Sequence, residues 1–170
     1  MELALSLPTK ARSWEVVKRA EELGYTHAWF YDTELLNAEV FAAMGAAATK
    51  TSRIKLSAGV LIPSNRIAPV AASGLATLNA LAPGRVVFGA STGFTARRTL
   101  GLGPVKLAQL EEYVKVVEGL LRGDTVDFRA EGSKHKIRFL NPELELINIK
   151  DPIPTFISAF GPRARDLTAK

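Results

Sequence analysis

An acidic residue closes one of the apolar runs of this sequence. Asp32 directly follows Ala28-Trp29-Phe30-Tyr31, a stretch with the composition of a buried strand. A carboxylate at the end of a strand can hydrogen-bond a ligand or take part in proton transfer. It can equally cap a helix or form an ion pair within a loop. The sequence leaves these interpretations open.

A second candidate site follows the apolar run of residues 86–88. The next five residues, GASTG at positions 89–93, are small or hydroxylated and leave the backbone open to a close approach by a ligand. A tight turn would account for them as well. Arg97 and Arg98 come next, and their guanidinium groups either bind an anion or are solvated.

These residues lie between elements that alternate regularly. Apolar runs predict strands at residues 3–7, 28–31, 54–62, 86–88 and 154–159. Amphipathic or alanine-rich segments predict helices at residues 13–23, 38–49, 69–82 and 107–121, with a further helix opening at Gly161-Pro162. Alternating strands and helices with uninterrupted apolar strands indicate an α/β fold with a parallel sheet.

The spacing of the strands favours a barrel. Their starts lie about 30 residues apart, which is the spacing of eight units in a (β/α)8 TIM barrel of about 250 residues. The rhythm breaks at residues 125–149, where TVDF and KIRF flank Glu131-Gly132-Ser133 and predict a β-hairpin insertion. We therefore expect one domain, residues 1–170, with about five βα units of an incomplete TIM barrel. A flavodoxin-like doubly wound sheet, with helices on both faces, is the alternative.

Composition narrows the classes of function. There is no cysteine, so disulfides and thiolate metal sites are excluded, and the two histidines lack clustered acids, so no metal site is predicted. The net charge is +5, but basic residues cluster only at residues 134–138, so nucleic-acid binding is not expected. The sequence has no candidate membrane span and its start is a poor signal peptide, which predicts a cytoplasmic protein.

Four stretches resemble the bacterial luciferase-like monooxygenase superfamily. They are AEELGYTHAWFYD, TSRIKLSAGVLIPSNRIAPVAASGLATLNALAPGRVVFGASTGF, KLAQLEEYVKVVEGLLRGDTV and PIPTFISAFGPRARDL. The resemblance implies a TIM barrel that binds reduced FMN or the 5-deazaflavin coenzyme F-420 (F420) and performs hydride transfer or oxygen insertion on a small organic substrate. It also implies that this chain corresponds to about the first half of such a barrel.

The resemblance implies cofactor-binding residues at the ends of the last three strands: Gly59, Val60, Ser91, Thr92, Gly93, Arg97, Ser158 and Gly161. In deazaflavin-dependent relatives the bond that matches Gly59–Val60 is a non-proline cis peptide that supports the cofactor ring from behind. The small residues at 91–93 would let a flat ring approach the backbone. The turn at 158–161 would contact the cofactor through backbone groups.

Asp32 and Thr33 are the predicted catalytic residues. Many relatives carry histidine directly after this acid, so Thr33 is a weaker acid–base group that keeps a hydrogen-bond donor. Several deazaflavin-dependent relatives have an acid where this chain has Phe94, which removes one candidate proton donor. The alternative is a truncated, non-catalytic half-barrel that binds flavin weakly or acts by oligomerisation. Its open sheet edges would be association sites, and a homo-oligomer is expected.

Overall fold

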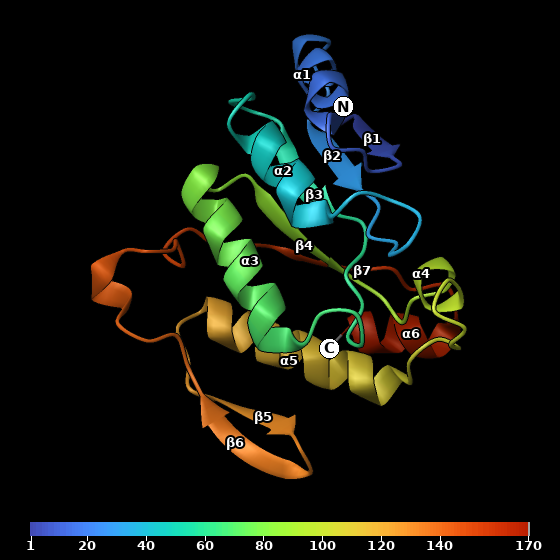
Figure 1. The fold of residues 1–170 in the computed structure, drawn as a ribbon, viewed down its shortest axis with the longest axis vertical. Helices are drawn as coiled ribbons and strands as arrows, with labels where there is room; N and C mark the ends of the chain where they lie inside the picture. The colour runs from blue at the N-terminus through green and yellow to red at the C-terminus, as the bar shows by residue number, and fades with distance from the viewer. Residues whose placement is uncertain (170) are drawn as a thin grey trace.

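Five short strands form one parallel sheet in the computed structural model, which describes residues 1–169. The sheet order is β1 (Ala4–Leu7), β2 (His27–Phe30), β3 (Lys55–Ala58), β4 (Val86–Ala90) and β7 (Thr155–Ile157), so neighbours in the sheet follow the order of the chain (Figure 1). A doubly wound sheet would reverse this order at a switch point, and that alternative is therefore wrong. Within the described residues the sheet stays open, with β1 and β7 at its edges, as expected for an incomplete barrel.

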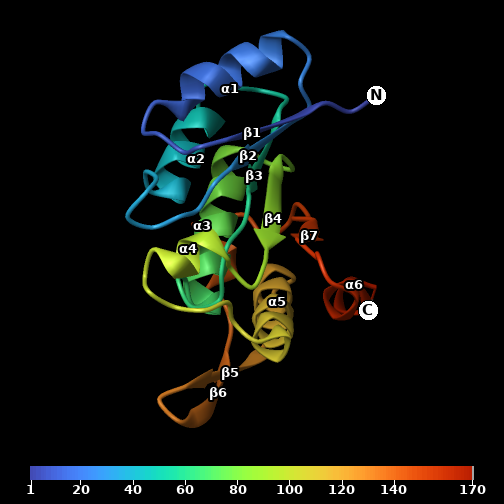
Figure 2. The ribbon, with the colours of Figure 1, turned by 90° about the vertical axis from the view of Figure 1, so that its right-hand side faces the viewer.

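Helices cover one face of this curved sheet (Figure 2). They are α1 (Ser13–Glu22), α2 (Val40–Ala48), α3 (Ala68–Leu81) and α5 (Leu107–Leu121), each within two residues of its predicted bounds. In α5 the apolar residues recur at helical spacing, so that Leu110, Val114 and Val117 share the buried face. Two shorter helices, α4 (Thr95–Arg98) and α6 (Pro162–Thr168), follow β4 and β7. None of the helices within residues 1–169 is long and apolar enough to cross a membrane.

The two faces of the sheet differ in burial because successive side chains of a strand point to opposite sides. Alternate strand residues, such as Phe30, Leu56 and Phe88, lie in the core between the sheet and the helices. The opposite face carries Trp29 and Phe156, whose rings meet edge to face with centroids 5.5 Å apart. Helices outside and side chains inside are the layers of a TIM barrel.

The third strand is shorter than predicted. The apolar run of residues 54–62 predicts one strand, but β3 ends at Ala58 and the peptide bond between Gly59 and Val60 is cis. Beyond Ala58, the N–H of Gly59 still donates to the carbonyl oxygen of Phe30 (2.7 Å), and an isolated bridge joins Leu61 to Ala90. The prediction was wrong because an apolar run reports burial and not the continuity of a hydrogen-bond ladder. The fifth strand, β7, is likewise shorter than its predicted range.

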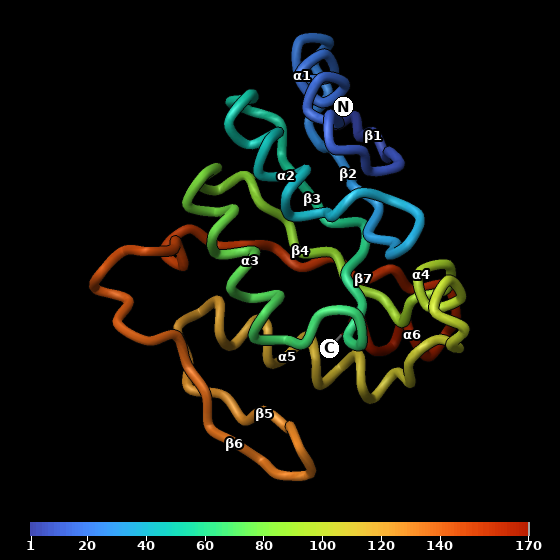
Figure 3. The backbone as a smooth tube through the Cα atoms, in the orientation of Figure 1, coloured from blue at the N-terminus to red at the C-terminus, as the bar shows by residue number. Residues whose placement is uncertain are grey.

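The predicted hairpin is present and lies outside the sheet (Figure 3). Its strands are β5 (Val126–Ala130) and β6 (Ser133–Ile137), joined by Glu131 and Gly132. Both turn residues have positive φ, 51° and 76°, as a two-residue turn of type I′ requires. The chain then passes through a 3-10 turn, η1 (Pro142–Leu144), before it returns to β7.

A buried asparagine of α3 binds the end of the segment that connects the hairpin to β7. The side chain of Asn79 is fully buried and donates through Nδ2 to the carbonyl oxygens of Asn148 (3.1 Å) and Asp151 (2.9 Å). Its Oδ1 accepts from the N–H of Gly84 (3.1 Å). The Asn148 side chain donates back to the carbonyl oxygen of Asn79 (3.2 Å). We call this pair the Asn79–Asn148 clamp. It fixes the chain immediately before β7.

A carboxylate closes the other end of the sheet, where the strands begin. Glu21 at the end of α1 accepts from the backbone N–H groups of Ser52 (3.0 Å), Arg53 (2.6 Å) and Ile54 (2.8 Å), just before β3. Burial pushes the pKa of Glu21 upward, but these donors and the charge of Arg53 outweigh it, so the pKa lies below its ordinary value. Glu21 thus stabilises the connection between α2 and β3 in its ionised form.

Replacing this carboxylate should therefore destabilise the fold in a pH-dependent way. We expect Glu21→Gln to lower the free energy of unfolding by about 2 kcal/mol at pH 7, because an amide cannot accept all three bonds. A lowered folded-state pKa gives stability that is present above the unfolded value of 4.5 and is lost as the pH falls through the folded value. Urea denaturation should show the difference from wild type shrinking below pH 4.5.

The matched control is Glu22→Gln. Glu22 is the next residue along α1 and forms an exposed ion pair with Arg19. Its substitution should change stability by less than about 0.5 kcal/mol. Equal losses for the two variants would contradict the role assigned to Glu21.

Candidate functional site

The largest cavity lies at the carboxyl ends of the strands and has a volume of about 740 Å³. Its lining is drawn from five loops: residues 8–10 after β1, 31–37 after β2, 59–62 after β3, 91–96 after β4 and 158–160 after β7. TIM-barrel enzymes carry their active sites at this end of the strands, and the volume is typical of small-molecule sites. We call this space the strand-end cavity.

Seven of the ten predicted site residues line the strand-end cavity: Asp32, Thr33, Gly59, Val60, Ser91, Gly93 and Ser158. Backbone hydrogen bonds tie their strand ends together. The N–H of Ser91 donates to the carbonyl oxygen of Leu61 (3.1 Å), and the N–H of Ser158 donates to that of Ala90 (3.0 Å). The Ser91 hydroxyl donates to the carbonyl oxygen of Ser158 (3.3 Å). The loops after β3, β4 and β7 therefore form one connected wall.

Two of the glycines in this wall have close neighbours. A Cβ on Gly93 would lie 2.7 Å from Arg97 and 2.9 Å from Ile62, and the φ of Gly93 is +74°. A Cβ on Gly59 would come within 3.3 Å of Trp29. The chain needs glycine at position 93 for its own packing and backbone conformation. At position 59 an added Cβ would require the Trp29 side chain to shift by a few tenths of an ångström.

Three predicted residues lie outside the lining. The Nε of Arg97 donates to the carbonyl oxygen of Gly103 (2.6 Å), which holds the guanidinium group within its own loop. The carbonyl oxygen of Thr92 accepts from the N–H of Val105 (2.9 Å), and Gly161 caps the start of α6. Arg98 stacks over the ring of Phe94 at 4.1 Å. These contacts show structural roles for the two arginines.

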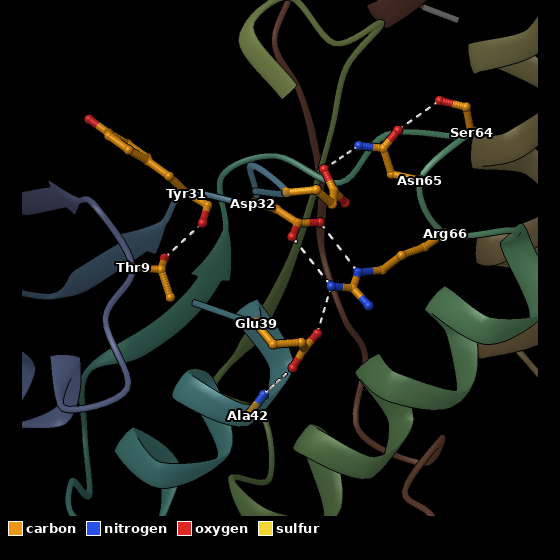
Figure 4. A network of polar contacts seen from close by, with 9 residues as sticks. Thr9, Tyr31, Asp32, Glu39, Ala42, Ser64, Asn65 and Arg66 are labelled. Atoms are coloured by element: carbon orange, nitrogen blue, oxygen red, sulfur yellow. Dashed lines mark hydrogen bonds and ion pairs between the residues drawn. The ribbon is translucent and has the colours of Figure 1, made fainter. Parts of the chain in front are cut away.

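Asp32 takes part in a polar network beneath the cavity (Figure 4). Its carboxylate accepts two hydrogen bonds from Arg66, from Nε and Nη2, each at 3.3 Å. Arg66 also forms an ion pair with Glu39 (2.6 Å), whose other oxygen accepts from the N–H of Ala42 (2.6 Å) at the start of α2. Arg66 thus links the loop after β2 to the loop before α3. Asp32 therefore forms the intramolecular ion pair that the sequence left open.

Asp32 is nevertheless suited to proton transfer. It is buried, with 6% of its surface exposed, and it lines the strand-end cavity. Burial is the largest influence on its pKa and raises it, although the hydrogen bonds and charge of Arg66 act in the opposite direction. A carboxyl group with a raised pKa in a cavity is a candidate acid or base.

Sequence reasoning missed several residues of the lining. Lys10, Leu36, Asn37 and Phe160 all face the strand-end cavity. They lie in loops where no periodic pattern exists, and their only sequence signal is that each follows a predicted strand by a few residues. The lining as a whole combines apolar side chains with a few polar groups, of which Lys10 and Asp32 are charged. It fits a flat heteroaromatic ring bound in the cavity.

Comparison with known proteins identifies the family. The family model described as luciferase-like monooxygenase matches residues 4–170. This chain belongs to that family. The resemblance found in the sequence is thereby confirmed.

Relatives in the luciferase-like family include several oxidoreductases. The chain is 32% identical over 135 residues to the F420-dependent glucose-6-phosphate dehydrogenase of Beutenbergia cavernae, covering 75% of this chain and 38% of that protein. It is 30% identical over 156 residues to the 5,10-methylenetetrahydromethanopterin reductase of Archaeoglobus fulgidus, covering 91% and 45%. The chain thus spans less than half the length of these curated relatives.

Solved structures of the family share the fold. The coenzyme F420-dependent tetrahydromethanopterin reductase of Methanopyrus kandleri superimposes with a TM-score of 0.78 at 23% identity, covering 99% of this chain and 52% of that chain. An F420-dependent secondary alcohol dehydrogenase superimposes with a TM-score of 0.75 at 24% identity, covering 98% and 55%. The match of the whole described sheet to about half of each larger chain supports an incomplete TIM barrel.

Proposed function

We propose that this chain forms the cofactor-binding part of an oxidoreductase that uses coenzyme F420 for hydride transfer to or from a small organic substrate. The observation that carries the proposal is the strand-end cavity, whose wall is formed by the connected loops after β3, β4 and β7. The resemblance implies that the backbone at Gly59 and Val60 supports the deazaflavin ring. Relatives named as F420-dependent, covering three quarters of this chain, support the choice of cofactor.

The proposal assigns roles to the residues of the cavity. F420, when bound, supplies a ring that carries a hydride. The backbone at Gly59–Val60, with Ser91, Gly93 and Ser158, would hold that ring. Apolar side chains, Ile62 and Phe94 among them, would exclude water from it.

Asp32 and Thr33 would act on the proton that is transferred together with the hydride, by hydrogen bonding and by proton transfer. The Thr33 hydroxyl makes no hydrogen bond within residues 1–169 and is available as a donor to a substrate oxygen. Asp32, next to it, holds or accepts a proton at its buried carboxyl group while Arg66 fixes its orientation.

An FMN-dependent oxygen insertion is the second candidate. It is favoured by the limonene 1,2-monooxygenase of Rhodococcus erythropolis, to which the chain is 30% identical over 156 residues, covering 88% of this chain and 40% of that protein. The same cavity would hold the isoalloxazine ring of FMN through the same backbone groups. The two candidates differ in the cofactor and not in the residues that surround it.

Anaerobic titration of the folded chain with F420, and separately with FMN, tests the proposal. We expect saturable binding of F420, followed by absorbance and fluorescence. Thr95→Trp should weaken it at least about tenfold, because the larger side chain enters the cavity. Thr99→Trp is the control, since Thr99 lies just beyond the same short helix and does not line the cavity.

The titration also separates the alternatives. Tighter binding of FMN than of F420 would favour the second candidate. Binding of neither cofactor by a chain that circular dichroism shows to be folded would overturn the proposal. The non-catalytic half-barrel would then account better for this polypeptide.

A further inference from the structure

Helix α5 carries a buried tyrosine that the proposed reaction does not use. Tyr113 is 5% exposed, and its hydroxyl oxygen makes no hydrogen bond within residues 1–169. Its ring packs against Phe88 of β4, with centroids 6.1 Å apart. Buried polar groups are nearly always paired, because an unpaired one costs free energy. A buried hydroxyl group at this position therefore calls for a physical reason.

This tyrosine lies between elements of the interior of the fold. Helix α3 begins at Ala68, two residues after Arg66, and packs against α5 (Figure 1). On the other side lies β4, which pairs with β3 and β7 and so is not an edge of the sheet. The surroundings of Tyr113 are therefore supplied by this chain and do not depend on the open edges of the sheet.

Two charges act on the Tyr113 hydroxyl group, those of Asp32 and Arg66. Burial is the main cause that raises the pKa of Tyr113, the negative charge of Asp32 raises it further, and the positive charge of Arg66 acts in the opposite direction. The hydroxyl group thus keeps its proton at neutral pH. Because a hydroxyl hydrogen can rotate to suit its surroundings, it can turn toward a negative charge.

The carboxylate of Asp32 has room for another donor. It accepts two hydrogen bonds, both from Arg66 and both at 3.3 Å, which is long for a bond between charged groups. An ionised carboxylate offers about four acceptor sites. Burial opposes its ionisation, and so do the nearby charges of Glu34 and Glu39. A hydroxyl dipole directed at Asp32 from the interior would offset part of that cost.

We propose that Tyr113 is a positioning residue for Asp32: its buried hydroxyl group turns its hydrogen toward the carboxylate and stabilises the ionised form, which can accept a proton. The two side chains are not directly hydrogen-bonded within residues 1–169, so the interaction acts through space or through one bridging water molecule. A low effective dielectric constant strengthens it. The inference rests on the proposed function only for the role of Asp32 in proton transfer.

The pKa of Asp32 tests the inference without a cofactor. It is measured by NMR from the pH titration of the side-chain carboxyl carbon, and the Asp32→Asn chain assigns the resonance. Tyr113→Phe removes the hydroxyl group and keeps the ring against Phe88. We expect this substitution to raise the pKa of Asp32 by about one pH unit, because the ionised form loses a favourable dipole.

Tyr25→Phe is the matched control. Tyr25 also packs against the core, but it lies just before β2 and does not line the strand-end cavity, which is at the other end of the strands. Its substitution should change the pKa of Asp32 by less than about 0.2 pH units. No rise of that pKa in the Tyr113→Phe chain, or an equal rise in the control, would overturn the inference.

A double-mutant cycle separates the interaction from packing. Tyr113→Phe should increase the equilibrium constant of unfolding about fivefold in the wild-type chain, but less than about twofold in the Asp32→Asn chain. A tyrosine that only fills the core would have the same effect in both backgrounds. An equal effect, or a Tyr113→Phe chain that is more stable than wild type, would contradict the role assigned to the hydroxyl group.

These measurements are independent of the F420 titration. A folded chain that binds no cofactor would overturn the proposed function, and the titration of Asp32 would still decide whether Tyr113 stabilises its carboxylate. An unchanged pKa of Asp32 in a Tyr113→Phe chain that binds F420 would overturn the inference alone.

Discussion

Replacement of Gly89 by alanine is expected to lower the free energy of unfolding by about 3 kcal/mol or more. Gly89 lies in β4, beside the point where β3 ends. A Cβ at this position would fall far inside van der Waals contact with the carbonyl oxygen of Ala58 and 3.1 Å from the ring of Trp29. Ala58 is fully buried backbone and Trp29 packs against Phe156, so neither neighbour can yield cheaply.

The effect of Gly89→Ala should extend to the cofactor. Ala58 directly precedes the Gly59–Val60 bond in the cavity wall, so movement of its carbonyl group would displace the proposed ring support. Urea denaturation measures the stability, and the F420 titration measures binding under conditions where the variant is still folded. We expect binding to weaken at least about tenfold.

Gly103→Ala is the control for this substitution. A Cβ on Gly103 would meet no atom within 4 Å, and its φ is not in the left-handed region. Its stability should stay within about 0.5 kcal/mol of wild type. A loss below 1 kcal/mol for Gly89→Ala would show that the sheet accommodates the added methyl group and that the steric argument is wrong.

Removal of the Arg66 charge should have a comparable effect for an electrostatic reason. We expect Arg66→Met to destabilise the chain by about 3–5 kcal/mol at pH 7, because it leaves the carboxylate of Asp32 buried without a cation. It also removes the ion pair with Glu39. Chemical denaturation at several pH values measures the loss.

The pH dependence has a definite sign. Burial already raises the folded-state pKa of Asp32 above its ordinary value of 3.8, and loss of Arg66 should raise it further. A raised carboxyl pKa means that folding takes up a proton, so the penalty is absent below pH 3.8 and grows as the pH rises toward the folded-state pKa. The loss caused by Arg66→Met should therefore be smaller at pH 4 than at pH 7.

A second substitution separates charge from packing. Asp32→Asn in the Arg66→Met background should recover a large part of the lost stability, because it removes the unpaired charge. Arg98→Met removes an exposed arginine that stacks on Phe94 and should cost less than about 0.5 kcal/mol. No recovery in the double variant would locate the loss in the packing of Arg66 against Phe41, 4.8 Å from its ring centroid.

The parts of the fold that depend on local pattern were predictable. The 3.6-residue spacing in α5 and the turn at Glu131-Gly132 each reflect neighbours in sequence, and both are confirmed. The placement of candidate residues after strands also held for Asp32 and Ser91, because parallel strands bring their carboxyl ends to one edge.

Contacts between residues far apart in the chain could not be predicted from the sequence. Arg66 pairs with Asp32 across 34 positions, and Asn79 with Asn148 across 69. No local pattern marks either partner. Arg97 illustrates the reverse error. Its position suggested an anion site, but its Nε donates to the carbonyl oxygen of Gly103, six residues further along the same loop, at 2.6 Å.

Because of the Asn79–Asn148 clamp, the segment that carries the hairpin can change in length without changing the geometry of the site. The chain leaves the sheet at Ala90 and re-enters it at Thr155, yet β4 and β7 pair directly. Since the clamp sets the point of re-entry, the segment before it can grow or shrink without shifting the register of β7. Doubling the length of a flexible loop costs only about 0.6 kcal/mol. The hairpin tip at Glu131-Gly132 is therefore a position where evolution, or a protein engineer, can add sequence while the cavity keeps its shape.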